Sequence, residues 1–249
     1  MTQTAAAAPL VPDPLRDRLA GFDLAALRET FLAQGEFVAV PDFLPAAGLA
    51  ALLAELPALE PRVHRNFIPG HKKGGSVSRY ELDAHAPAFP GFYRSQALLE
   101  FLQQLAGRPL LHCPPDDPHT YALYYYTEAG DHIGWHYDTS YYKGERYTVL
   151  LGLEDRSSCK LEYELFHDDA QRAAVPGAVS ITPGMLVVFN GDKLWHRVTP
   201  SAAGERRVVL TLEYLTSLGM HPLRRFVSNM KDAIAYFGFR QVFSGPRRS

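Results

Sequence analysis

Two histidines and an aspartate, set in strand-like sequence, constrain this chain more than any other feature. His136 and Asp138 are separated by one residue, and His196 follows 58 positions after Asp138. Residues i and i+2 of a β-strand point to the same side, so His136 and Asp138 can bind one metal ion together. His196, from a second strand, would complete the set. The spacing therefore predicts a metal site built on paired strands.

The surrounding sequence indicates a mainly β protein with flanking helices. Short apolar runs at 149–153 and 186–189 are bounded by turn signals, as expected of buried strands. Strand-like segments dominate residues 110–215, whereas helical spacing appears at 23–32 and 46–56. Two histidines and one carboxylate leave open coordination positions, an arrangement typical of non-heme Fe(II) oxygenases.

The stretch around the second histidine resembles the distal half of the Fe(II)/2-oxoglutarate-dependent oxygenases, with prolyl-hydroxylase-like spacing. The residues that carry the resemblance are Pro183-Gly184-Met185-Leu186-Val187-Val188-Phe189-Asn190, Trp195-His196-Arg197-Val198, Pro200 and Gly204-Glu205-Arg206. The motifs cover about residues 120–215. The resemblance implies a double-stranded β-helix barrel of the jelly-roll or cupin type. It also implies Fe(II) bound by His136, Asp138 and His196, with 2-oxoglutarate and O2 as cosubstrates and succinate and CO2 as products.

In this superfamily a basic residue about ten positions after the second histidine holds the distal carboxylate of 2-oxoglutarate. Arg206 stands at that position, and an arginine fork pairs with a carboxylate through two parallel hydrogen bonds. Strand alternation places Arg206 on the same face as Val208 and Leu210, where a desolvated guanidinium needs an anion. We therefore expect Arg206 to bind 2-oxoglutarate and Arg207, on the other face, to be solvated.

Aromatic residues before the first histidine are further candidates for cosubstrate binding. In the run Tyr124-Tyr125-Tyr126, alternation turns Tyr124 and Tyr126 to one face. If that face is the interior, either hydroxyl could donate a hydrogen bond to 2-oxoglutarate or line the substrate space. The alternative interpretation is that aromatic residues simply favour strands.

A finer resemblance concerns the substrate. Residues 92–99, 105–107 and 130–136 are similar to small bacterial enzymes that hydroxylate or halogenate free amino acids. The related halogenases carry a small residue where this chain has Asp138, so the resemblance implies hydroxylation. The expected substrate is a free amino acid or a similar small polar molecule, and the alternative is a protein side chain such as proline.

Composition excludes some partners and predicts a cellular setting. The formal net charge of −2 gives no nucleic-acid footprint, and no apolar run approaches the length of a membrane span. Basic clusters at 62–65 and 71–73 are expected to be solvated loops, although the first could attract an anionic cosubstrate. The two cysteines, Cys113 and Cys159, form no disulfide framework. These features predict a cytoplasmic protein.

The expected organisation is one oxygenase domain at 15–249 after an Ala/Pro-rich lead at 1–14 that is predicted to be disordered. Within the domain, residues 15–107 would form a helical or mixed support, 108–216 the barrel core and 217–249 a helical tail. Two other functions keep the same ligand set: a non-catalytic metal-binding barrel that acts as a sensor, and a zinc-dependent hydrolase or isomerase. The complete ligand set together with Arg206 argues against the sensor, because degenerate members usually lack one of these residues. A buried arginine at the cosubstrate position has no evident use in the hydrolase or isomerase.

Overall fold

The computed structural model describes residues 14–138 and 141–220, and it is built on one strongly curved β-sheet. The strand order is β1-β10-β7-β12-β5-β3-β6-β11-β8-β9, with β2 added to β3 and β4 added to β12. The strands are β1 (Phe37–Val40), β2 (His64–Ile68), β3 (Lys72–Ser78), β4 (Leu111–His112), β5 (Tyr121–Tyr126), β6 (His132–His136), β7 (Arg146–Arg156), β8 (Leu161–Leu165), β9 (Val175–Val179), β10 (Leu186–Asn190), β11 (Trp195–Val198) and β12 (Arg206–Leu215). All pairings are antiparallel.

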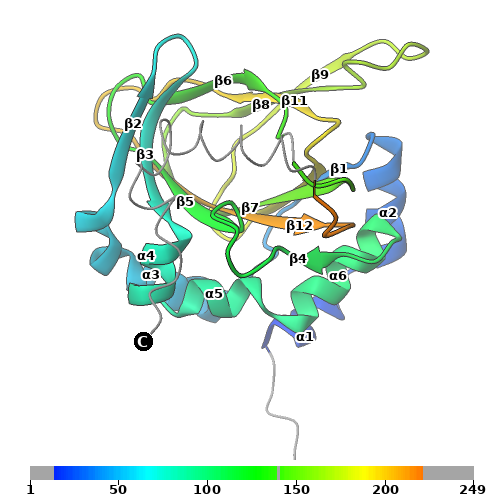
Figure 1. The fold of residues 1–249 in the computed structure, drawn as a ribbon, viewed down its shortest axis with the longest axis horizontal. Coiled ribbons are helices and arrows are strands. Elements are labelled where there is room, and N and C mark those ends of the chain that lie inside the picture. Colours follow the sequence, from blue (N-terminus) through cyan, green and yellow to red (C-terminus); the bar gives the residue numbers. More distant parts are fainter. Residues whose placement is uncertain (1–13, 139–140, 221–249) are drawn as a thin grey trace, which may run out of the picture.

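The sheet turns back on itself at β3, which pairs with β5 along its C-terminal half and with β6 at its N-terminal end. The half that contains β6, β11 and β8 therefore faces the half that contains β10, β7 and β12 (Figure 1). This is the nearly closed antiparallel barrel of the double-stranded β-helix fold, so the predicted fold class is confirmed.

Helices cover the outer face of the β7–β12 half of the sheet (Figure 1). They are α1 (Pro14–Leu19), α2 (Leu24–Ala33), α3 (Ala46–Leu59), the short 3-10 helix η1 (Glu60–Arg62), α4 (Arg79–His85), α5 (Ala88–Tyr93) and α6 (Gln96–Ala106). Helix α6 is capped at both ends. The Ser95 side chain accepts a hydrogen bond from the Leu98 N–H at its start, and Gly107 ends the helix in the left-handed region at φ 68°. The helices predicted at 23–32 and 46–56 are confirmed as α2 and α3.

Two apolar clusters define the two faces of the sheet. The outer cluster packs α3, α5 and α6 against side chains such as Val149, Val208 and Leu210. The inner cluster lies between the two halves of the sheet and includes Tyr126, Phe189 and Val209. Strands such as β7 and β12 contribute to both clusters, so both of their faces are buried.

The segment before residue 107 supplies strands as well as helices. Of the basic clusters predicted to be solvated loops, the one at 62–65 runs from the end of η1 into β2, and the one at 71–73 runs from the hairpin turn into β3. Lys72 is only 1% exposed, and its ammonium lies 4.5 Å from the centre of the Tyr124 ring. That part of the prediction is wrong, because the paired strand Lys72–Ser78 forms one wall of the barrel. Residues 1–13 and 221–249 contain most of the predicted lead and of the predicted tail, and they lie outside the described residues. Pro14, the last residue of the predicted lead, is the first residue of α1.

Candidate active site

The structure brings His136, Asp138 and His196 together at the end of β6 and the start of β11. His136 and His196 are directly paired in the antiparallel register, and their ring centroids are 4.2 Å apart. Asp138 follows β6, and its backbone N–H donates to the Gly191 carbonyl at 3.0 Å. One ligand atom from each of the three residues lies within 4.8 Å of the others.

Each histidine presents the nitrogen that a metal requires. The Nδ1 atoms lie 2.8 Å from the Gly134 carbonyl for His136 and 2.9 Å from the Leu194 carbonyl for His196. A proton on Nδ1 that is donated to the carbonyl leaves the Nε2 lone pair free. The Nε2 atoms lie 3.4 Å from Oδ1 of Asp138 and 3.8 Å from its Oδ2, respectively. The donor set therefore fits a divalent metal ion.

Burial and mutual charge set the protonation of these groups. Burial alone would raise the pKa of Asp138, but His196 and His136 hold this pKa well below its usual range. His196 is 4% exposed, and burial lowers its pKa to about 4 despite the neighbouring Asp138. His136 is also desolvated, but its hydrogen bond and charge interaction with Asp138 raise its pKa. At neutral pH the site therefore holds an ionised carboxylate beside an uncharged His196.

A second layer of polar groups stands behind the aspartate. The Thr148 hydroxyl on β7 lies 2.8 Å from Oδ2 of Asp138 and 3.1 Å from Oε2 of Glu213. The Arg146 Nε donates to the same Glu213 oxygen at 2.5 Å. Burial raises the pKa of Glu213 to about 7, against the opposing effects of Arg146 and Thr148. Thr148 and Glu213 were not predicted from the sequence, although polar residues at alternate positions of apolar strands are the signal that could have indicated them.

The predicted position of Arg206 is wrong. Arg206 lies on the outer face of β12, where its guanidinium pairs with Glu60 and Glu154 and sits 5.7 Å from the centre of the Tyr125 ring. The alternation itself was predicted correctly, because Val208 and Leu210 share this face. However, the helices cover this face, and the candidate metal ligands lie on the other side of the sheet.

Arg207 occupies the interior position that was predicted for Arg206, so the prediction that Arg207 is solvated is wrong. It is 1% exposed, and its Cζ lies 4.8 Å from the centre of the Tyr126 ring. Within the described residues, its Nε and Nη1 atoms have no hydrogen-bond partner. Tyr126 belongs to the inner cluster with Phe189. The ring centroids of Phe189 and His196 are 4.9 Å apart. A buried guanidinium with free donors in the same interior as the metal ligands fits the carboxylate of a bound anion.

Tyr124 and Tyr126 both pack with the inner cluster, whereas Tyr125 belongs to the outer one. Burial raises the pKa of Tyr126 to about 12, although Arg207 lowers it through its charge and a hydrogen bond. The Tyr126 phenol is therefore neutral and can act as a hydrogen-bond donor. The contact of Tyr124 and Tyr126 with 2-oxoglutarate stays a prediction.

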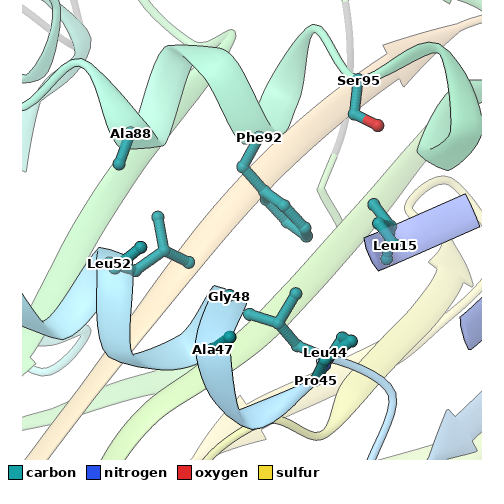
Figure 2. Close-up of a pocket in the computed structure, with 10 residues that line it drawn as sticks. Leu15, Leu44, Pro45, Ala47, Gly48, Leu52, Ala88, Phe92 and Ser95 are labelled. Atoms are coloured by element: carbon teal, nitrogen blue, oxygen red, sulfur yellow. The ribbon is translucent and has the colours of Figure 1, made fainter. Parts of the chain in front are cut away.

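An apolar pocket of about 350 Å³ lies outside the barrel, between α1, α3 and α5 (Figure 2). Its walls are formed by Leu15, Leu44, Pro45, Ala47, Gly48, Ala51, Leu52, Ala88, Phe92 and Ser95. None of the candidate metal ligands lines it. This pocket is therefore separate from the candidate metal site.

Comparison with known proteins finds two matching family models. Residues 120–213 match the family model of the 2OG-Fe(II) oxygenase superfamily, and residues 20–143 match a model described as Halogenase D. A search of curated proteins found no match. The chain is thus similar, over residues 120–213, to a superfamily of oxygenases that use Fe(II), 2-oxoglutarate and O2.

Solved structures agree with this fold. The epimerase SnoN from nogalamycin biosynthesis, described as non-heme and alpha ketoglutarate dependent, is 17% identical with a TM-score of 0.63, covering 77% of this chain and 81% of that one. A Pseudomonas putida prolyl-4-hydroxylase is 19% identical with a TM-score of 0.58, covering 77% and 97%. A Trichoplax adhaerens prolyl hydroxylase, in complex with a hypoxia inducible factor peptide fragment, is 14% identical with a TM-score of 0.63, covering 82% and 92%.

Among the described residues, no helix is both long and apolar enough to cross a membrane.

Proposed function

We propose that this chain hydroxylates an unactivated C–H bond of a free amino acid or a close derivative. His136, Asp138 and His196 would hold Fe(II), and Arg207 would receive the distal carboxylate of 2-oxoglutarate. The observation that carries the proposal is a two-histidine, one-carboxylate set and a buried guanidinium with free donors in the same barrel interior. Neither a sensor nor a zinc hydrolase has an evident use for that guanidinium.

The protein's own groups have distinct parts in this reaction. Bound Fe(II) supplies the activation of O2 against a C–H bond, coupled to conversion of 2-oxoglutarate to succinate and CO2. With a proton on Nδ1, His136 and His196 would offer their Nε2 atoms to the metal, and Asp138 would offer an ionised oxygen. The planar fork of Arg207 would bind the distal carboxylate through two hydrogen bonds and so orient the cosubstrate. Phe189 is buried and packs on His196, so its ring would help to exclude water from the inner side of the site.

Two observations support an amino acid as the substrate and hydroxylation as the outcome. The Halogenase D model matches residues 20–143, which contain the segments that resemble amino-acid hydroxylases and halogenases. Asp138 provides a carboxylate at the position where the related halogenases have a small residue and bind halide. A protein side chain is the second candidate, because two structural neighbours are described as prolyl hydroxylases.

The test is substrate-dependent succinate formation by the Fe(II)-loaded enzyme with 2-oxoglutarate in air. The twenty common amino acids are compared with a proline-containing peptide, with and without chloride, and products are identified by mass. We expect one amino acid or a small group to stimulate succinate formation and to gain one oxygen atom. Turnover only with the peptide would move the assignment to the second candidate. A chlorinated product from the wild-type enzyme would contradict the role given to Asp138.

A further inference from the structure

The Thr148 hydroxyl lies between two carboxylates in the barrel interior. Thr148 is 1% exposed, and its Oγ1 is 2.8 Å from Oδ2 of Asp138. The same Oγ1 is 3.1 Å from Oε2 and 3.4 Å from Oε1 of Glu213. A hydroxyl group has one proton to donate, so it can serve only one of these carboxylates at a time. The shortest contact is the one with Asp138.

Arg146 gives Glu213 a hydrogen-bond donor other than the Thr148 hydroxyl. Its Nε donates to Oε2 of Glu213 at 2.5 Å, and Glu213 is itself 2% exposed. Because a charge-assisted hydrogen bond from the guanidinium already serves the Glu213 carboxylate, that group does not depend on the threonine proton. Thr148 is therefore free to donate to the aspartate.

The two oxygens of Asp138 consequently have different surroundings. Oδ2 accepts from Thr148 and lies 3.8 Å from Nε2 of His196, whereas Oδ1 lies 3.4 Å from Nε2 of His136 and has no such hydroxyl donor among the described contacts. We propose that Thr148 is a positioning residue that commits Oδ2 to a hydrogen bond and leaves Oδ1 as the single oxygen offered to the metal. A carboxylate that bound through both oxygens would occupy a further position on the ion. The hydroxyl thus helps to keep the positions free that 2-oxoglutarate and O2 need.

This inference rests on the proposed metal centre, and its test does not depend on catalysis. Fe(II) dissociation constants are measured anaerobically by competition with a chelator, without 2-oxoglutarate. Thr148→Val keeps the shape of the side chain and removes the hydroxyl, whereas Thr148→Ser keeps the hydroxyl. Thr211→Val on β12 is the matched control, since its position faces the same interior but no described hydrogen bond joins it to a ligand residue.

We expect Thr148→Val to weaken Fe(II) binding about 10- to 100-fold, the usual effect of losing a partner of a ligand. Thr148→Ser and Thr211→Val should stay within about threefold of wild type. The melting temperature of the metal-free proteins identifies a merely structural effect, which would lower stability without changing Fe(II) affinity. If Thr148→Val does not fold, Thr148→Ala provides the same comparison with Thr148→Ser.

Wild-type Fe(II) affinity in Thr148→Val would overturn the positioning role. Equal losses in the valine and serine variants would also overturn it, because the methyl packing and not the hydroxyl would then be responsible. Failure of the wild-type protein to bind Fe(II) would overturn the proposed metal centre itself, so the two failures are distinguishable.

Discussion

Arg206 and Arg207 are adjacent in the sequence, and the sheet separates them onto opposite faces. Arg206 is neutralised by Glu60 and Glu154 under the helices, whereas Arg207 is buried in the barrel with free donor groups. The difference in their surroundings, and not a difference in residue type, determines which one can bind a carboxylate.

Arg207→Ala should raise the KM for 2-oxoglutarate about 10- to 100-fold, since a hydrogen bond to a charged group contributes about 1.5–3 kcal/mol. Fe(II) affinity without 2-oxoglutarate should change little. Arg206→Ala is the matched control, and its KM should stay within about threefold, because only a partly exposed ion pair is lost. Steady-state succinate assays measure the KM for 2-oxoglutarate in both variants. A larger effect at Arg206 than at Arg207 would contradict the assignment.

The buried carboxyl group of Glu213 should make the free energy of unfolding depend on pH. Its pKa is raised from 4.5 to about 7, chiefly by burial, so the folded state keeps a proton that the unfolded chain has lost. The free energy of unfolding should therefore fall as the pH rises from about 4.5 through about 7, by up to about 3 kcal/mol.

Glu213→Gln cannot titrate, so the slope of stability against pH should be shallower in this variant. Urea unfolding of metal-free protein at about pH 5, 6, 7 and 8 measures the slope. The comparison uses the slope and not the absolute stability, because the substitution also removes the ion pair with Arg146. Equal slopes in the two proteins would show that Glu213 does not titrate in this range.

At the scale of single elements, the sequence predicted strands better than it predicted which face of a strand meets the site. The apolar runs at 149–153 and 186–189 lie in strands β7 and β10, and His196 lies on a different strand from His136, as expected. Alternation identifies residues that share a face. It cannot tell an interior face from a face under helices when both are buried, as they are along β12. The misplaced arginine follows from that ambiguity.

The turn between β10 and β11 should control the metal site through Gly191. A Cβ added at Gly191 would lie 2.9 Å from the Cβ of Asp138 and 3.0 Å from its carbonyl oxygen. Gly191→Ala should therefore displace Asp138 and weaken Fe(II) binding by about tenfold or more, as a disturbed ligand does.

Gly91→Ala is the matched control for this prediction, because nothing lies within 4 Å of its added Cβ. Gly91 is inside α5, where alanine is the better helix former by about 1 kcal/mol. This variant should keep wild-type Fe(II) affinity and be at least as stable as the wild type. Chelator competition measures the affinity of both variants. Unchanged affinity in Gly191→Ala would show that the turn accommodates the extra methyl group without moving Asp138.

For the whole molecule, the sequence predicted the barrel but not the strand that joins its two halves. The barrel depends on β3, which pairs with both β5 and β6. The sequence of β3, Lys-Lys-Gly-Gly-Ser-Val-Ser, is basic and glycine-containing, and such a composition favours loops. Pairing with two strands overrides this preference. Such long-range pairing depends on the assembled sheet, so local sequence patterns do not show it.

We propose that the barrel holds Fe(II) and 2-oxoglutarate together through His136, Asp138, His196 and Arg207. The measurement that tests this best is anaerobic visible absorption of the metal-loaded protein during titration with 2-oxoglutarate. We expect a weak visible charge-transfer band that saturates in the wild-type protein, requires far more 2-oxoglutarate in Arg207→Ala, and is lost in His196→Ala. Absence of the band from folded, Fe(II)-loaded wild-type protein, or its persistence in His196→Ala, would contradict the claim.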